Sequence, residues 1–213
     1  MSGPRRTIAL SRWALERNLG LIAAQRSPAS VVIDVRADAY GHGAVDVARI
    51  ASEHGFVWFA EDEASAARVD DVVTQVVYGT GFGGEPVMTV LGEVLAVKQV
   101  PPGSAVSYGY TYRVEAAGRL ALVGLGYADG LPRAASNRAH AAVRGSRVLV
   151  AGRIAMDQFM LDLGPADAQR GDDVVVWGGG DAPRVGDWAA VSGFEPLALT
   201  AGLGARFTRE WRA

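Results

Sequence analysis

In the N-terminal part of the chain, the apolar residues alternate between the spacing of a strand and the spacing of a helix. Residues 7–10 form a short apolar run that predicts a strand. Ser11 is placed to cap a helix in which Leu15, Leu19 and Ile22 recur at helical spacing. The serines and the proline that come next predict where this helix ends.

The alternation continues after this helix. The pattern predicts a buried strand over 31–35, a small-residue loop over 37–43, a helix over 44–54, a strand over 56–60, a helix over 61–69 and a strand over 72–78. This order is a βαβαβ run, in which the strands are parallel and the crossovers right-handed. We therefore expect a fragment of an α/β sheet here.

The pattern changes at residues 79–86, which read GTGFGGEP and contain four glycines and one proline in eight residues. Such a composition predicts a turn or a linker, and we place a domain boundary near residue 85. Short β-rich runs separated by turn residues follow at 94–100, 120–127, 148–151, 159–163 and 174–177. We expect one domain over 1–85 and a second over 86–213, the second a small β barrel or sandwich.

The amino-acid composition excludes several classes of function. With 213 residues, 49% of them hydrophobic, the chain can bury a substantial core. Lysine and arginine number 21 against 23 aspartates and glutamates, so the net charge of −2 gives no general attraction to nucleic acid or to anionic membranes. The absence of cysteine excludes disulfides and thiolate chemistry, and no metal site is expected. No apolar stretch approaches the ~20 residues of a membrane span, so a cytoplasmic location is expected.

Four motifs then carry a resemblance. Residues 35–44 read VRADAYGHGA and are similar to the cofactor-lysine motif of the alanine racemase family. In that family a lysine at this point forms a Schiff base with pyridoxal 5′-phosphate (PLP), and a tyrosine four residues later contacts the phosphate. The resemblance assigns these positions to Arg36 and Tyr40, and it makes His42 a second candidate for binding the cofactor phosphate.

The remaining motifs resemble the C-terminal domain of the same family. PVMT at 86–89 and VSYG within 94–113 are followed by GYADGLPR at 126–133 and GRIAMDQFMLDL at 152–163. The resemblance makes Tyr108 the acid/base tyrosine that reaches into the active site of a partner subunit. It also places four residues around the substrate entrance and the substrate carboxylate, namely Tyr127, Asp129, Met156 and Asp157.

The resemblance implies a fold and a reaction. The expected fold class is an α/β N-terminal fragment of a (β/α)8 barrel plus an all-β C-terminal domain, a barrel like the C-terminal domain of alanine racemase. The family reaction is the PLP-dependent interconversion of L- and D-alanine, an isomerase reaction that supplies a peptidoglycan precursor, and family members are dimers.

Two departures from the family set the expectation for activity. Arg36 stands at the lysine position, and a guanidinium is protonated at any ordinary pH, so it cannot form the Schiff base. A closed (β/α)8 barrel takes roughly 200 or more residues. Only the segment 31–78 is available for barrel strands, and it leads directly through 79–85 into the second domain.

This shortening predicts an incomplete sheet. Three parallel strands with helices on one face leave the opposite apolar face and both edges open. The chain's own β domain, its N-terminal helix or a second copy could cover that face. We favour the second copy, and so expect a homo-oligomer, a dimer, because exposed parallel edges promote self-association.

Each candidate residue also has a structural interpretation. Arg36 binds an anion, or it forms an ion pair with Asp34 or Asp38, which we favour. Tyr40 and His42 bind phosphate or serve packing, with no preference between the two. The alternative for Tyr108 is a partly buried tyrosine clustered with two neighbouring tyrosines, Tyr110 and Tyr112. Asp129 and Asp157 are alternatively turn acids, and Met156 is alternatively a core filler.

Three functions follow from these residues. The first is an alanine racemase homologue in which catalysis is impaired or lost, a pseudoenzyme for which PLP is a cofactor by family resemblance only and is not held as an internal aldimine. The second is a non-catalytic subunit that pairs with a full-length racemase and supplies Tyr108. The third is an enzyme that acts on a small amino acid by PLP-independent chemistry, and nothing in the spacing selects it.

Overall fold

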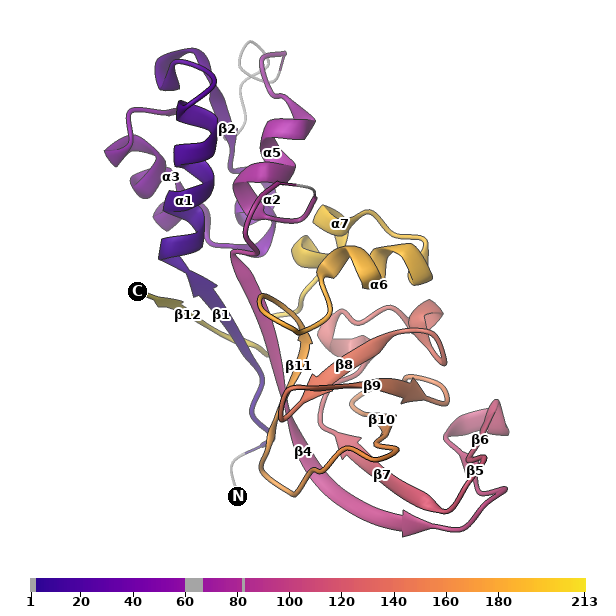
Figure 1. Cartoon of the computed structure of the whole chain (residues 1–213). Coiled ribbons are helices and arrows are strands. Elements are labelled where there is room, and N and C mark those ends of the chain that lie inside the picture. Colours follow the sequence, from indigo (N-terminus) through magenta and orange to yellow (C-terminus); the bar gives the residue numbers. More distant parts are fainter. Residues whose placement is uncertain (1–2, 60–66, 82) are drawn as a thin grey trace.

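The computed structural model describes residues 3–59, 67–81 and 83–213, with helices gathered at one end and a β barrel at the other (Figure 1). The helices are α1 Arg12–Ala23, α2 Arg36–Gly41, α3 Ala44–Glu53, α5 Asp71–Tyr78, α6 Val185–Ser192 and α7 Pro196–Ala201. The strands are β1 Thr7–Ser11, β2 Val32–Asp34, β3 Val57–Phe59, β4 Met88–Val100, β5 Ala105–Val106, β6 Tyr112–Arg113, β7 Gly118–Val123, β8 His140–Val143, β9 Ser146–Ala151, β10 Phe159–Asp162, β11 Asp173–Trp177 and β12 Thr208–Arg212.

The C-terminal part of the chain forms a closed barrel. Its strands follow the order β11-β8-β9-β10-β7-β4, and β11 pairs again with β4, so the ring has no free edge. Buried and partly exposed residues alternate along the first half of β4, as a strand with one face on a core requires. The expected β domain is therefore confirmed, and it is a barrel and not a sandwich.

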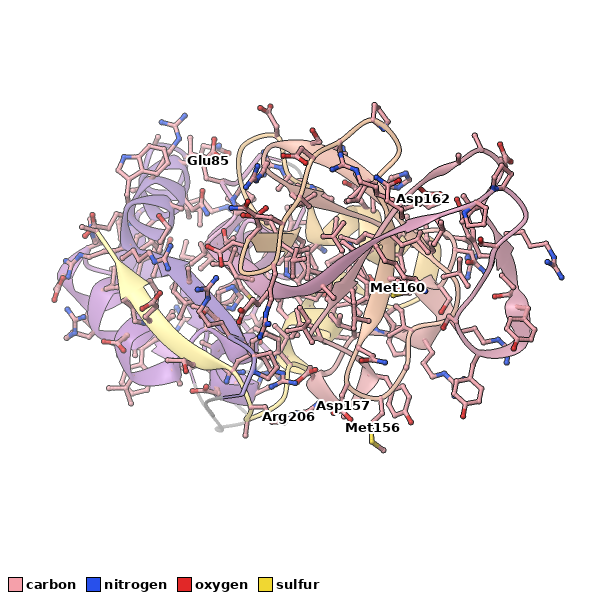
Figure 2. The ribbon with its side chains drawn as sticks, turned by 90° about the horizontal axis from the view of Figure 1, so that it is seen from below. Glu85, Met156, Asp157, Met160, Asp162 and Arg206 are labelled. Carbon is pink, nitrogen blue, oxygen red and sulfur yellow. The ribbon has the colours of Figure 1, made fainter. Side chains whose placement is uncertain are left out.

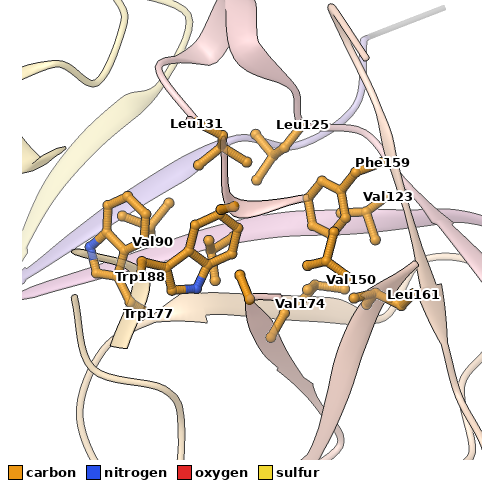
Figure 3. Packing of buried hydrophobic residues seen from close by; sticks show 14 of the residues in the cluster. Val90, Val123, Leu125, Leu131, Val150, Phe159, Leu161, Val174, Trp177 and Trp188 are labelled. Atoms are coloured by element: carbon orange, nitrogen blue, oxygen red, sulfur yellow. The ribbon is translucent and has the colours of Figure 1, made fainter. Parts of the chain in front are cut away.

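The barrel interior is filled by aliphatic side chains and two indoles (Figure 3). The rings of Trp177 and Trp188 meet edge to face with their centroids 5.7 Å apart. The same core includes Ile8 and Leu10 of β1, because β1 pairs antiparallel with β4 and parallel with β12. The first strand of the sequence thus belongs to the sheet of the barrel, and the division of the chain at residue 85 remains a prediction.

The N-terminal helices and short strands match the pattern of the sequence closely. The Ser11 hydroxyl accepts a hydrogen bond from the amide of Ala14 at 3.1 Å and caps α1. Strands β2 and β3 pair in parallel, with Val32 opposite Val57. The structure is therefore a partial barrel joined to a β domain, as expected. The predicted helix over 61–69 and the end of the strand over 56–60 lie largely outside the described residues.

The third strand predicted over 72–78 is wrong, because this segment forms helix α5. The Asp70 carboxylate accepts hydrogen bonds from the amides of Val72 and Val73, at 3.0 and 3.2 Å, and caps the helix. Gly79 ends it in the left-handed conformation, with φ 63°. Val73 and Val77, one helical turn apart, are buried, so tertiary packing outweighs the strand preference of valine.

A buried asparagine joins α1 to the segment after α5. The Asn18 side-chain amide donates to the carbonyls of Val77 and Glu85, and its oxygen accepts from the Glu85 amide at 2.7 Å. These bonds satisfy backbone groups where α5 ends and the chain turns toward β4. The chain passes directly from α5 to β4 without further barrel strands, and the Asn18 side chain holds this connection in place.

The open sheet face predicted for this fragment is largely covered by the chain itself. All three residues of β2 are buried, and α5 lies against β2 where a further strand was expected. Only β3 among the described strands of this small sheet presents apolar side chains to solvent, at Val57 and Trp58. The expectation of a wholly open face is therefore corrected, because the helix that replaced the strand supplies the cover.

The loop expected over 37–43 begins as a left-handed turn. Ala37, Asp38, Ala39 and Tyr40 have φ between 51° and 55°, inside α2. A left-handed residue with a Cβ costs about 1–2 kcal/mol, so four in sequence require strong support from their surroundings. Ala39 is fully buried and the amide of Ala44 donates to the Asp38 carboxylate at 2.9 Å, which supplies part of that support.

We predict that Ala37→Gly leaves stability unchanged or raises it by up to about 1 kcal/mol, because glycine adopts the left-handed conformation without the steric penalty. Ala190→Gly, at an exposed position of the right-handed helix α6, should instead lower stability by about 1 kcal/mol. Urea unfolding of both variants checks this pair. Equal losses in the two variants would contradict the left-handed assignment.

Candidate functional site

A buried carboxylate organises the loop that carries the resemblance to the cofactor-lysine motif. Asp34 is at the end of β2 and only 1% exposed. It accepts from the backbone amide of Arg36 at 3.0 Å, from Arg36 Nε at 2.9 Å and from the Tyr40 hydroxyl at 2.5 Å. The hydroxyl of Tyr78 in α5 donates to the Asp34 carbonyl at 2.5 Å. One residue therefore connects β2, the left-handed turn and α5.

Arg36 is turned back onto its own strand. Its Nη2 lies 2.6 Å from Asp34 Oδ2, and its guanidinium lies over the ring of Phe59 at 5.3 Å. The side chain is about half exposed, so part of the ion pair faces solvent. Of the two interpretations of Arg36, the ion pair with Asp34 is the one observed, and its pairing with Asp38 is not among the contacts of the described residues.

The charges in this cluster shift the acidities of its members. Burial, the largest effect, raises the pKa of Asp34, but the bonds from Arg36 and Tyr40 outweigh it and hold that pKa below its ordinary value. Burial, and then the bond donated to Asp34, raise the pKa of Tyr40 to about 12. The phenol of Tyr40 is therefore protonated at neutral pH and donates to a carboxylate that is ionised.

His42 is packed and not exposed. It is fully buried beside Tyr78, with the two ring centroids 4.6 Å apart, and its Nδ1 lies 2.8 Å from the carbonyl of Ala39. Burial lowers the pKa of His42 to about 4, so the ring is neutral at pH 7. Tyr40 and His42 thus show the packing and hydrogen bonding of the structural interpretation, while phosphate binding by either remains a prediction.

Tyr108 lies at the other end of the molecule from this cluster. It sits in a 3₁₀ turn between β5 and β6, the small hairpin at the lower right of Figure 1, while α2 is among the helices at the top. The Ser107 hydroxyl donates to the Arg153 carbonyl at 2.6 Å and fixes the turn to the loop before β10. Within one chain, Tyr108 therefore cannot act together with Arg36.

The suggestion that Tyr108 is a partly buried member of an aromatic cluster is wrong. Its side chain is 83% exposed, and Tyr110 is exposed as well. Tyr112 points elsewhere, because its hydroxyl donates to Asp162 at 2.7 Å, and burial followed by this bond raises the pKa of Tyr112 to about 12. The three tyrosines do not alternate along one strand, since Ser107 and Tyr110 take positive φ and turn the chain.

An open groove of about 560 Å³ runs beside Tyr108 over the outer face of the barrel. Its walls come from β4, β7, β10 and the Tyr108 turn, and the lining is mainly apolar. Lys98, the only lysine of the chain, is on its rim.

The two acids predicted near a substrate carboxylate are both paired with arginine. Asp129 is completely buried, its Oδ2 accepts from the Gly126 amide at 2.8 Å, and Arg6 and Arg206 lie 3.0 and 2.9 Å from its Oδ1. Asp157 is exposed and lies 2.5 Å from Arg206 (Figure 2). Asp129 thus has the contacts of a turn acid, and a substrate role for either acid remains a prediction.

Met156 and Tyr127 lie close to these acids on the surface. Met156 is 54% exposed, so its interpretation as a core filler is wrong, and Tyr127 lies under the guanidinium of Arg133 at 5.4 Å. The amide of Tyr127 donates to the carbonyl of Ala155 at 3.0 Å, which joins the two motifs. Arg206 pairs with both Asp129 and Asp157, and the Ala128 amide donates to the Met156 carbonyl, so the structure brings the loops of the four predicted substrate residues together.

Sequence analysis named Asp34 only as a possible partner of Arg36, and it missed Arg206. Asp34 had a usable signal, because a charged residue inside the apolar run VVIDV requires a partner. Arg206 had none, because its contacts with Asp129 and Asp157 join positions far apart in the sequence.

Comparison with known proteins identifies the family of this chain. The family model of the alanine racemase C-terminal domain matches residues 87–211, and that of the N-terminal domain matches residues 10–144. The chain belongs to the alanine racemase family. It is 45% identical over 119 residues to alanine racemase of Salinispora arenicola and 45% identical over 130 residues to that of Streptomyces coelicolor, which are 55% and 60% of this chain.

The chain spans about a third of the length of these curated racemases, 32% and 33% respectively. Solved alanine racemases share its fold. That of Streptomyces lavendulae superposes with a TM-score of 0.85 at 20% identity, covering 100% of this chain and 98% of that one. The racemase of Streptomyces coelicolor superposes with a TM-score of 0.83 at 21% identity, covering 97% of this chain and 98% of that one. The racemase family is PLP-dependent. No helix within the described ranges is long and apolar enough to cross a membrane.

We predict that acid destabilises this racemase homologue through His42. The unfolded histidine takes up a proton near its ordinary pKa of about 6.5, whereas the folded one stays neutral down to about 4. Between these values the unfolded state binds more protons, so the unfolding free energy falls as the pH falls, by on the order of 1–2 kcal/mol from about pH 7 to about pH 5.

His42→Gln should flatten this dependence, while His54→Gln, at an exposed position, should leave it unchanged. Urea unfolding across this pH range measures how the unfolding free energy changes with pH in the wild type and in both variants. A wild-type slope that His42→Gln does not alter would show that another group is responsible.

Proposed function

We propose that this chain is an alanine racemase homologue without racemase activity of its own. The observation that carries the proposal is the state of position 36, where the family has its Schiff-base lysine. Arg36 has no primary amine, and its guanidinium is bound to Asp34 by Nε and Nη2. The bond to Asp34 raises the pKa of Arg36 above its already high ordinary value, so the group is neither a nucleophile nor a base.

The residues around Arg36 do not fit covalently held PLP. The Tyr40 hydroxyl, which the resemblance directs toward the cofactor phosphate, donates to Asp34. His42 is enclosed and cannot reach a ligand at the surface. The Tyr40 hydroxyl is therefore used within the loop, and the loop offers no imine-forming group.

The acid/base machinery is also incomplete. Racemisation removes a proton from one face of the α-carbon and returns one to the other face, which requires two opposed proton-transfer groups. Tyr108 is the one group that the resemblance still supplies. It is too far from Arg36 in the same chain to share a substrate with the loop at the end of β2 (Figure 1).

We predict that the purified chain neither racemises alanine nor forms a PLP imine, and that Arg36→Lys does not gain either property. A lysine at position 36 would meet the Asp34 carboxylate as an ammonium ion, and the missing barrel leaves few groups to orient the cofactor. The measurements are the exchange of L- and D-alanine, and the absorption of added PLP with borohydride trapping.

The trapping experiment has an internal control. Because Lys98 is the only lysine of the unmodified chain, a reduced adduct on that chain must lie there or at the amino terminus, and peptide mapping with Lys98→Arg separates the two. In Arg36→Lys, the same mapping shows whether an adduct lies at position 36. Alanine racemisation by the unmodified chain would refute the proposal. Racemisation by Arg36→Lys would show that only the lysine had been lost.

A second candidate role is that of a subunit for a full-length racemase, and the exposure of Tyr108 favours it. The tyrosine is 83% exposed beside the open groove, and it belongs to the part of the chain that matches the family's C-terminal domain. In a mixed dimer, Tyr108 would serve a partner active site that has its own lysine and PLP.

A complementation assay tests this role. The partner is the Streptomyces coelicolor alanine racemase with the tyrosine that aligns with Tyr108 replaced by phenylalanine. Adding the wild-type chain should raise its racemase rate on the order of 100-fold, the usual contribution of one acid/base group. Tyr110→Phe, at the other exposed tyrosine of the turn, should act as the wild type does, and Tyr108→Phe should not. Restoration by Tyr108→Phe, or no mixed dimer in size-exclusion chromatography, would exclude the role.

A further inference from the structure

Three buried polar atoms belong to residues that line one small cavity between the helical part and the barrel. They are His42 Nε2, Thr80 Oγ1 and Trp177 Nε1, and none has a hydrogen-bond partner among the described residues. Their residues are 0%, 7% and 1% exposed. A polar atom buried without a partner loses its bonds to water and gains nothing in exchange, so three at one place indicate a bound molecule.

The hydrogen-bonding character of each atom follows from its surroundings. His42 Nδ1 lies 2.8 Å from the Ala39 carbonyl and therefore carries the proton, which leaves Nε2 as an acceptor. The indole nitrogen of Trp177 is a donor only, and the Thr80 hydroxyl both donates and accepts. The other large buried indole of the barrel, Trp188, donates directly to the His140 carbonyl at 2.9 Å, so Trp177 is the exception in this core.

The chemistry of the three atoms selects the ligand. An anion cannot donate to His42 Nε2, and an ammonium ion cannot accept from the Trp177 indole. A water molecule does both and also bonds to a hydroxyl. The space between the walls is about 10 Å³ for the centre of a water molecule, which admits one water and nothing larger. Apolar wall residues, Met88, Pro86 and Val185, offer no competing partner.

We infer that His42, Thr80 and Trp177 bind one structural water molecule, which bridges the loop after β2 to the barrel. His42 ends the left-handed turn, Thr80 follows the C-terminal glycine of α5, and Trp177 ends β11. The water therefore connects three segments far apart in the sequence. It holds the Arg36 loop against the barrel, and it is independent of whether the chain binds PLP.

A high-resolution crystal structure of the wild-type chain tests the inference directly. The expected result is density for one water within about 3.2 Å of all three atoms. Direct contact between any two of the three side chains, or a cavity without density, would overturn it.

Oxygen-17 relaxation dispersion in solution is the second measurement, because its amplitude scales with the number of waters held longer than the protein tumbles. Thr80→Val keeps the shape of the side chain and removes one partner, so the amplitude should fall by the contribution of one water. Thr200→Val is the matched control, since Thr200 lines the same cavity but its hydroxyl donates to the Leu197 carbonyl. An equal loss in both variants, or none in Thr80→Val, would overturn the inference, and should Thr80→Val not fold, the crystal structure decides.

Discussion

The ionised carboxylate of Asp34, enclosed at the end of β2, is the constraint around which the N-terminal part of this chain is arranged. A buried carboxylate is stable only when hydrogen bonds and an opposite charge replace its water. Arg36 and Tyr40 supply them from a backbone turn that is left-handed over four residues with a Cβ. The strain of that turn is tolerated because the carboxylate and the buried Ala39 hold it, and Tyr78 fixes the same strand end from α5.

The same contacts support the proposal that the family's chemistry is lost at position 36. In a racemase the group at position 36 must be an amine free to react with an aldehyde. Here it is a guanidinium that neutralises a buried charge, so its role is structural. Arg36 thus joins β2 to the left-handed turn through Asp34.

The barrel, by contrast, lies within the part of the chain that matches the family's C-terminal domain, residues 87–211. Its ring of strands is closed, the Tyr108 hairpin is fixed to the loop that carries Met156 and Asp157, and these residues reach the surface. The exposure of Tyr108 leaves it accessible to a partner subunit, as the proposed second role requires.

The sequence alone determined the elements whose pattern is local: the Ser11-capped α1, helix α3, strands β2 and β3, and most strands of the barrel. The spacing of their apolar residues and their capping residues lie within or next to each element's own sequence. Only the tertiary structure decided that residues 72–78 form a helix, because a valine-rich run satisfies either period until packing against α1 selects one. Three further features depend on contacts between distant segments, which no local pattern encodes. They are the closure of the barrel by the pairing of β11 with β4, the pairing of β1 with β12, and the separation of Tyr108 from Arg36.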